Sequence, residues 1–199
     1  MASLLHGILG ALLRVQSAAS LPMCLLSAFG GKSCVTEEEP RYIFGQGALK
    51  GRKLYCAKAN LTACEAVSVY NAMIWLGSGV PFERVKREFL RRGALTLFFL
   101  GFFGGNPYSI GRVLKGMGLV YEKVTPEKMV RDGAYIISFW NGSNDPSLHT
   151  VFCVRNGGRF SVYNLYSNDS FPRYLDIGKY EKMFIRGYYL GSGKTIYES

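Results

Sequence analysis

Apolar residues recur at helical spacing in the middle of the chain and give its clearest predicted element. Thr62 and Glu65 stand three residues apart, as in a capping box, and Gly77 follows the last apolar position. We therefore predict a helix from Thr62 to Leu76, with Cys64 in its first turn. The apolar positions on one face of this helix are Ala66, Val69, Tyr70, Met73 and Ile74.

The rest of the body alternates between helical and strand-like patterns. Two further helices are predicted, at residues 81–92 and 108–117, around an apolar segment at 94–108. Runs rich in β-branched and aromatic residues then predict strands at 134–140, 150–155, 160–165 and 184–190. Helices followed by an antiparallel sheet predict the α+β fold class.

The two middle strands are predicted to form a hairpin. Asn156-Gly157 is the strongest short hairpin signal in the sequence, and it would fill a two-residue type I′ turn. With that turn, Arg155 pairs with Gly158, and His149 lies directly opposite Asn164. Side chains opposed in this way share a face, with Cβ atoms about 5 Å apart.

The first forty residues differ from the body. An apolar stretch covers residues 3–13, Gly30-Gly31 follows, and Glu37 to Pro40 reads as a linker. The sequence thus divides into an N-terminal segment at 1–40 and a domain at 41–199. Four interpretations of the N-terminal segment are open: a poorly matching signal peptide, a helix packed on the domain, a prosegment, or the result of a wrongly chosen start codon. As a prosegment it could be cut at Gly30-Gly31.

Composition narrows the classes of function. The chain has 199 residues, 48% of them hydrophobic and 19% charged, which excludes a disordered protein. Its apolar runs are shorter than the roughly 20 residues that span a bilayer, so no transmembrane span is expected. The net charge of +10 favours acidic partners, but no nucleic-acid motif accompanies it. The basic cluster at residues 84–92 contains Glu83 and Glu88 as neighbours and is interpreted as a solvated helix face.

The cysteine and histidine counts argue against disulfides and metals. Five cysteines form an odd set without regular spacing, no CxxC is present, and the chain has only two histidines. We therefore predict no metal, and the glycine-rich Gly104–Pro107 lacks a phosphate-loop pattern, so no cofactor is predicted either. Free thiols favour a reducing, cytoplasmic compartment, with secretion as the alternative if residues 1–34 act as a signal.

Three residues form a candidate catalytic group. Cys64 near a helix N-terminus would lie among unpaired N–H groups, which favour the nucleophilic thiolate. His149 is the only histidine of the body and can serve as base, and Asn164 opposite it can orient the imidazole. Glu65 opposes this interpretation because a neighbouring carboxylate disfavours a thiolate. The alternatives are a small buried cysteine and a structural histidine.

Three segments resemble papain-like cysteine peptidases of the C39, or bacteriocin-leader peptidase, type. CEAVSVYNAMIWLG (64–77) resembles the nucleophile helix of that family, and HTVFCVRNGGRFSVYNL (149–165) its His-containing hairpin. The segment at 106–124 resembles the family's middle helix and strand. The resemblance implies a papain-like fold over roughly residues 55–190 and a Cys-His-Asn peptidase acting on a peptide or protein substrate.

The sequence also departs from that family. The usual Asp-Cys-Gly-Pro is replaced here by Ala63-Cys64-Glu65-Ala66, and the Gln expected six residues before the cysteine is Lys58. Asn60 is the nearest amide that could help to hold an oxyanion, and a missing donor costs on the order of 10²–10³ in rate. The hypotheses are therefore a cysteine peptidase, a catalytically idle papain-like module that binds a peptide or partner protein, and an acyl transferase of the same fold.

Overall fold

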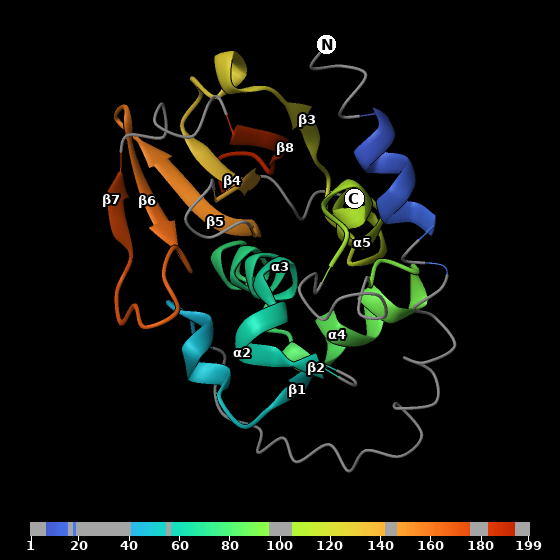
Figure 1. Cartoon of the computed structure of the whole chain (residues 1–199). Helices are drawn as coiled ribbons and strands as arrows, with labels where there is room; N and C mark the ends of the chain where they lie inside the picture. Colours follow the sequence, from blue (N-terminus) through green and yellow to red (C-terminus); the bar gives the residue numbers. More distant parts are fainter. Residues whose placement is uncertain are drawn as a thin grey trace.

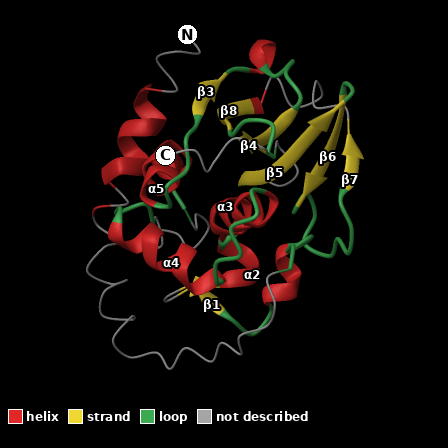
Figure 2. Ribbon diagram, turned by 180° about the vertical axis from the view of Figure 1, so that it is seen from behind, coloured by secondary structure: helices red, strands yellow, loops and turns green. Residues whose placement is uncertain are grey.

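The computed structural model describes residues 7–15, 18, 41–54, 57–95, 105–141, 147–175 and 183–193. Figure 1 shows a helical part beside a strongly twisted sheet, and Figure 2 shows the same division from behind. The described chain is therefore a mixed α+β fold with an antiparallel sheet, as the sequence predicts.

The helices precede most of the strands along the chain. In order they are residues 7–15, the 3-10 helix η1 (Gln46–Leu49), α2 (Ala59–Thr62), α3 (Cys64–Trp75), α4 (Phe82–Arg91), the 3-10 helix η2 (Pro107–Ser109), α5 (Ile110–Gly116) and the 3-10 helix η3 (Pro126–Lys128). The helices predicted at 81–92 and 108–117 are thus confirmed, the latter as η2 followed by α5.

The strands form one large and one small sheet. They are β1 (Lys53–Leu54), β2 (Ala57–Lys58), β3 (Glu122–Val124), β4 (Gly133–Trp140), β5 (Leu148–Asn156), β6 (Arg159–Tyr163), β7 (Arg173–Leu175) and β8 (Phe184–Tyr189). The larger sheet has the order β3-β8-β4-β5-β6-β7, with antiparallel neighbours throughout, and β1 pairs with β2 alone.

Helix α3 is the centre of the fold and packs on β5 and β4. Every residue from Cys64 to Met73 is buried, so the helix is covered on all sides. Side chains alternate along a strand, and the sheet therefore separates two hydrophobic cores. Phe152 of β5 belongs to the core beneath α3, whereas Cys153 belongs to the core on the other face.

The start of α3 differs from the predicted capping box. The helix begins at Cys64, and its N-cap residue Ala63 provides no side-chain cap. Thr62 instead ends the short helix α2, where its hydroxyl donates to the Lys58 carbonyl at 3.0 Å. The Glu65 carboxylate turns toward Gly105 rather than back to the helix end. Cys64 is consequently the first helical residue, not the second.

The hairpin register also differs from the prediction. The turn consists of Gly157 and Gly158, with φ of 56° and 85°, and Asn156 pairs with Arg159. Neither glycine has a Cβ that opposes the positive φ of a type I′ turn, so Gly157-Gly158 competes with Asn156-Gly157 for the turn. This turn moves the pairing by two positions, so His149 does not lie opposite Asn164.

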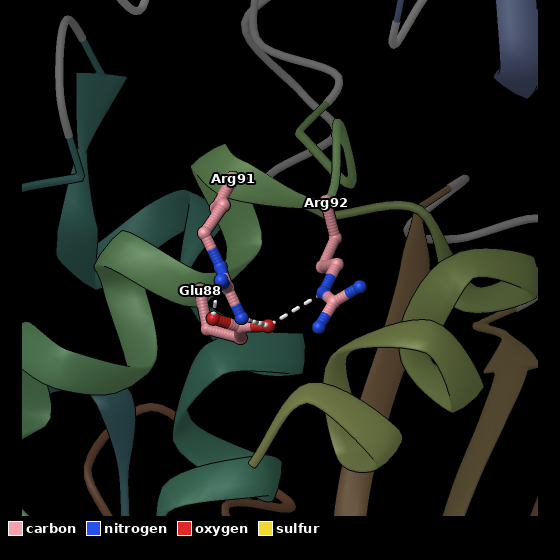
Figure 3. Close-up of polar contacts among 3 residues, drawn as sticks. All are labelled: Glu88, Arg91 and Arg92. Carbon is pink, nitrogen blue, oxygen red and sulfur yellow. Dashed lines mark hydrogen bonds and ion pairs between the residues drawn. The ribbon is translucent and has the colours of Figure 1, made fainter.

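Helix α4 carries the basic cluster, and its charges are largely paired along the helix. Glu88 bridges Arg91 and Arg92, whose guanidinium groups lie 2.9 Å and 2.6 Å from its carboxylate (Figure 3). Burial opposes ionisation of Glu88, but the hydrogen bonds from the two arginines outweigh it and lower its pKa. Arg84, Arg87 and Arg91 are exposed, which agrees with the interpretation of this cluster as a solvated helix face, whereas Glu88 is buried.

Several predicted features lie outside the described residues. These are Gly30-Gly31, the phenylalanines between 96 and 104, and Cys24, Cys34 and Cys56. In the part of the chain that is described, Cys64 and Cys153 are free thiols. The same part contains no helix long and apolar enough to cross a bilayer.

Candidate functional site

Cys64 lies at the first position of α3 but is buried, with 5% of its surface exposed. Its thiol donates to Glu65 Oε2 at 3.2 Å. Burial raises the pKa of the thiol well above its ordinary value, and the charge and hydrogen bond of Glu65 raise it further. The lowered pKa expected at a helix N-terminus is therefore absent, because burial and the neighbouring carboxylate outweigh the helix end.

Glu65 is a carboxyl group enclosed between α3 and β5, with 1% exposed. It accepts hydrogen bonds from the Gly105 amide at 3.0 Å and from Thr150 Oγ1 at 3.3 Å. Burial raises its pKa to about 7, against the opposing effect of these hydrogen bonds. Glu65 therefore changes its charge near neutral pH.

Gly105 makes the enclosure of Glu65 possible. A Cβ at this position would stand 2.8 Å from the Cβ of Glu65, closer than real side chains approach. Its backbone is bridged to Leu95, which keeps its N–H directed at the carboxylate. The glycine-rich segment noted in the sequence thus contributes a donor to this buried acid.

Thr150 joins the helix end to the sheet. Its hydroxyl lies 2.9 Å from Ser138 Oγ on the neighbouring strand β4. Ser68 Oγ, one turn into α3, lies 2.8 Å from the Cys64 carbonyl and 3.1 Å from the Thr150 carbonyl. We call Cys64, Glu65, Ser68, Ser138 and Thr150 the thiol–carboxyl cluster.

His149 belongs to a different set of contacts. Because Thr150 faces α3, its neighbour His149 is directed to the opposite face of β5. There its ring makes an edge contact with Phe139, a member of the second core, at 5.7 Å between centroids. Its Nε2 lies 2.6 Å from the main-chain carbonyl of Asn164. The described contacts thus give Cys64 and His149 different partners.

Asn164 contacts His149 through its main-chain carbonyl and not through its side chain. Its backbone adopts φ of 60°, the left-handed conformation that Asn tolerates better than most residues, and its N–H donates to the Phe44 carbonyl. The side-chain Oδ1 of Asn164 accepts a hydrogen bond from the main-chain N–H of Gln46 at 2.7 Å. The Asn164 carbonyl therefore takes the orienting position predicted for the amide side chain.

Gln46 is a site residue that the sequence analysis did not identify. It lies in η1 between Gly45 and Gly47, and a Cβ at either glycine would stand 2.5 Å from the Ser167 carbonyl. The signal available in the sequence was a glutamine flanked by two glycines. The buried atoms Gln46 Oε1 and Asn164 Nδ2 have no hydrogen-bond partner among the described residues. We call His149, Asn164 and Gln46 the imidazole–amide cluster.

The last predicted residue, Asn60, lies in the short helix α2, four residues before Cys64, and is partly exposed. The described geometry does not give the Asn60 side chain a contact through which it could hold an oxyanion. Among the described residues, no group of three or more His, Cys, Asp and Glu side chains is arranged to hold a metal ion.

No protein-family model matches the chain, and no curated protein matches it.

Proposed function

We propose that this chain is a papain-like module that binds a peptide or partner protein and holds its Cys64 thiol protonated. The observation that carries the proposal is the hydrogen bond from the Cys64 thiol to the buried Glu65 carboxylate. A thiol must lose its proton to act as a nucleophile. Burial raises the pKa of the thiol, and its pKa is raised further because loss of the proton would place two negative charges side by side within the protein.

The imidazole–amide cluster supports the binding of a peptide. Asn164 Oδ1 must face the Gln46 N–H, which fixes the amide orientation and leaves Nδ2 as an unpaired donor. Gln46 Oε1 is an unpaired acceptor nearby in the same cluster. A peptide group could pair with both atoms, because its carbonyl needs a donor and its N–H needs an acceptor. Because both atoms are buried, binding would require η1 to move from the hairpin.

A second candidate is the cysteine peptidase, or an acyl transferase with the same first step. It is favoured by the pKa of Glu65, which is raised to about 7 and suits a general base near neutral pH. In this reaction Glu65 would accept the Cys64 proton while Sγ attacks the substrate carbonyl. Because Cys64 is buried, access of a substrate to Sγ would require movement of the residues that cover it.

The pH dependence of alkylation by iodoacetamide separates the two candidates. The binding module predicts slow alkylation of Cys64 up to pH 8 and faster alkylation in Glu65→Gln, which removes the neighbouring charge. Cys153 is the control within the same chain, because it is also buried and its pKa is raised by burial alone. Iodoacetamide should alkylate Cys153 at the same rate in the wild type, in Glu65→Gln and in His149→Ala.

The opposite result supports the enzyme. Rapid alkylation of Cys64 at pH 6 to 7, lost in Glu65→Gln or in His149→Ala, would show a thiolate sustained by a neighbouring group and would overturn the idle module. Titration with a library of short peptides, followed by intact mass of both peptide and protein, then distinguishes binding from cleavage and from acyl transfer.

A further inference from the structure

The helix at residues 7–15 is apolar on two opposite faces. One face packs on the domain, where Leu13 is 2% exposed and Gly10 lies against the ring of Tyr108, 3.7 Å from the position of a Cβ. Ile8, Leu12 and Val15 follow the spacing i, i+4 and i+7, so they form a stripe on the opposite face. In Figure 1 this is the blue helix beside α5.

The stripe is open to solvent. Ile8, Leu12 and Val15 are 50%, 61% and 70% exposed. A single exposed apolar side chain is ordinary on a protein surface. Three in line on one helix, with Ala11 between them, differ from the polar outer face that a surface helix usually presents. Such a face indicates a binding surface.

The surroundings of the helix carry positive charge. Tyr108, which contacts the helix, belongs to η2, the 3-10 helix directly before α5, and α5 exposes Arg112 and Lys115. Neither the helix nor residues 105–121 contain an acidic residue. The whole chain has a net charge of +10. An exposed apolar stripe on a helix that packs beside a basic segment, in a chain of net charge +10, complements a surface that is apolar within and anionic at its boundary.

We infer that the helix at 7–15 and α5 form a face that binds anionic lipid bilayers. The helix would lie in the plane of the interface, with Ile8, Leu12 and Val15 among the acyl chains and the basic side chains of α5 at the headgroups. A second copy of the chain fits this face less well, because it would bring two strongly positive molecules together. This inference is independent of the chemistry at Cys64.

Co-sedimentation of the full chain with vesicles tests the inference. The vesicles consist of phosphatidylcholine alone or with roughly one third phosphatidylglycerol. The wild type should bind the anionic vesicles, and the triple variant Ile8→Gln, Leu12→Gln, Val15→Gln should bind at least about tenfold more weakly. Leu61→Gln with Val130→Gln is the matched control, since these side chains are 62% and 66% exposed outside the helix at 7–15 and residues 105–121 and should not matter.

Charge variants, added salt and the oligomeric state test the inference further. Arg112→Gln with Lys115→Gln should weaken binding to the anionic vesicles, and added salt should do the same. Equal binding by the wild type and the triple variant, or no binding by the wild type, would overturn the inference. A dimer seen by sedimentation velocity and lost in the triple variant, without vesicle binding, would assign the stripe to a second copy instead. Circular dichroism establishes that each variant is folded.

Discussion

Glu65 decides the chemistry at the start of α3. A cysteine at a helix N-terminus usually gains acidity from the helix end. Here the next residue is a carboxyl group with 1% of its surface exposed, which accepts the thiol proton in a hydrogen bond and disfavours its loss. Burial and this neighbouring side chain together convert a position suited to a nucleophile into one that holds a neutral thiol.

The buried Glu65 should also make stability depend on pH. Its pKa is about 7 in the folded chain and 4.5 when unperturbed, so between these values the folded state binds more protons. The free energy of unfolding therefore falls as pH rises through this window, by a few kcal/mol at about 1.4 kcal/mol per pKa unit. Urea unfolding of wild type and Glu65→Gln from pH 4.5 to 7.5 checks this, as the difference between them should decline with pH.

Glu88→Gln is the control with the opposite sign. The arginines lower the pKa of Glu88, so its contribution is present above pH 4.5 and is lost as pH falls below it. The difference between wild type and Glu88→Gln should be flat from pH 5 to 7.5. A flat difference for Glu65→Gln as well would show that Glu65 titrates normally.

The close approach of Gly105 to Glu65 predicts a second effect at the residue scale. Gly105→Ala would place a Cβ 2.8 Å from the Cβ of Glu65, so the backbone must shift and weaken the Gly105 N–H···Glu65 bond. Overpacking of this kind costs about 1–3 kcal/mol. Gly7→Ala is the control, since nothing lies within 4 Å of its Cβ position. Chemical denaturation of both variants measures the difference, and equal stabilities would contradict the enclosure.

The sequence indicated the position of Cys64 better than its surroundings. Helical periodicity is a local signal, so the helix and its first turn were predictable from residues 62–77. The enclosure of Glu65 depends on Gly105, 40 residues away, and on Thr150, 85 residues away. The position of His149 relative to Asn164 depends on a turn shifted by one residue, which changes every pairing along the hairpin.

Elements were predictable in proportion to their length. The helices were predictable because apolar residues recur in them at helical spacing. The predicted strands correspond to β4, β5, β6 and β8, each of which has five or more residues. The strands β1, β2, β3 and β7 have two or three residues, which is too short for an alternation of apolar and polar positions to be recognised. Their pairing follows from the surrounding fold rather than from their own sequences.

The hairpin turn between β5 and β6 gives a prediction at the scale of the element. Gly157 has φ of 56° with no atom near its Cβ position, so a substitution there reports the backbone cost alone. Gly157→Ala should lower the free energy of unfolding by about 1 kcal/mol. Gly157→Asn should cost less, because Asn tolerates the left-handed region. Equal losses for Ala and Asn in thermal unfolding would show that the turn is not type I′.

At the scale of the whole molecule, the sheet order explains why α3 is buried on all sides. Strand β8 enters between β3 and β4, so β4 and β5 are the central strands, and α3 packs directly on them. Helices α4 and α5 then cover parts of α3 that the sheet leaves open. This arrangement could not be predicted from the sequence, because the pairing of β8 with β3 joins residues that are 63 to 67 positions apart.

The net charge of +10 predicts how the whole molecule responds to salt. Lys53 and Lys58 are direct cross-strand partners in the small sheet, Lys50 and Arg52 are exposed beside them, and none of the four has an ion pair with a described residue. Directly opposed like charges destabilise a strand pair, whereas opposite charges contribute roughly 0.2–1 kcal/mol. Lys53→Glu should therefore raise the melting temperature by a few degrees at about 10 mM salt. At about 0.5 M salt the gain should largely disappear, because exposed charges are screened within a few ångströms.

Lys53→Gln, which removes the repulsion without adding attraction, should give a smaller gain. A melting temperature that Lys53→Glu lowers at low salt would contradict the opposition of these two lysines.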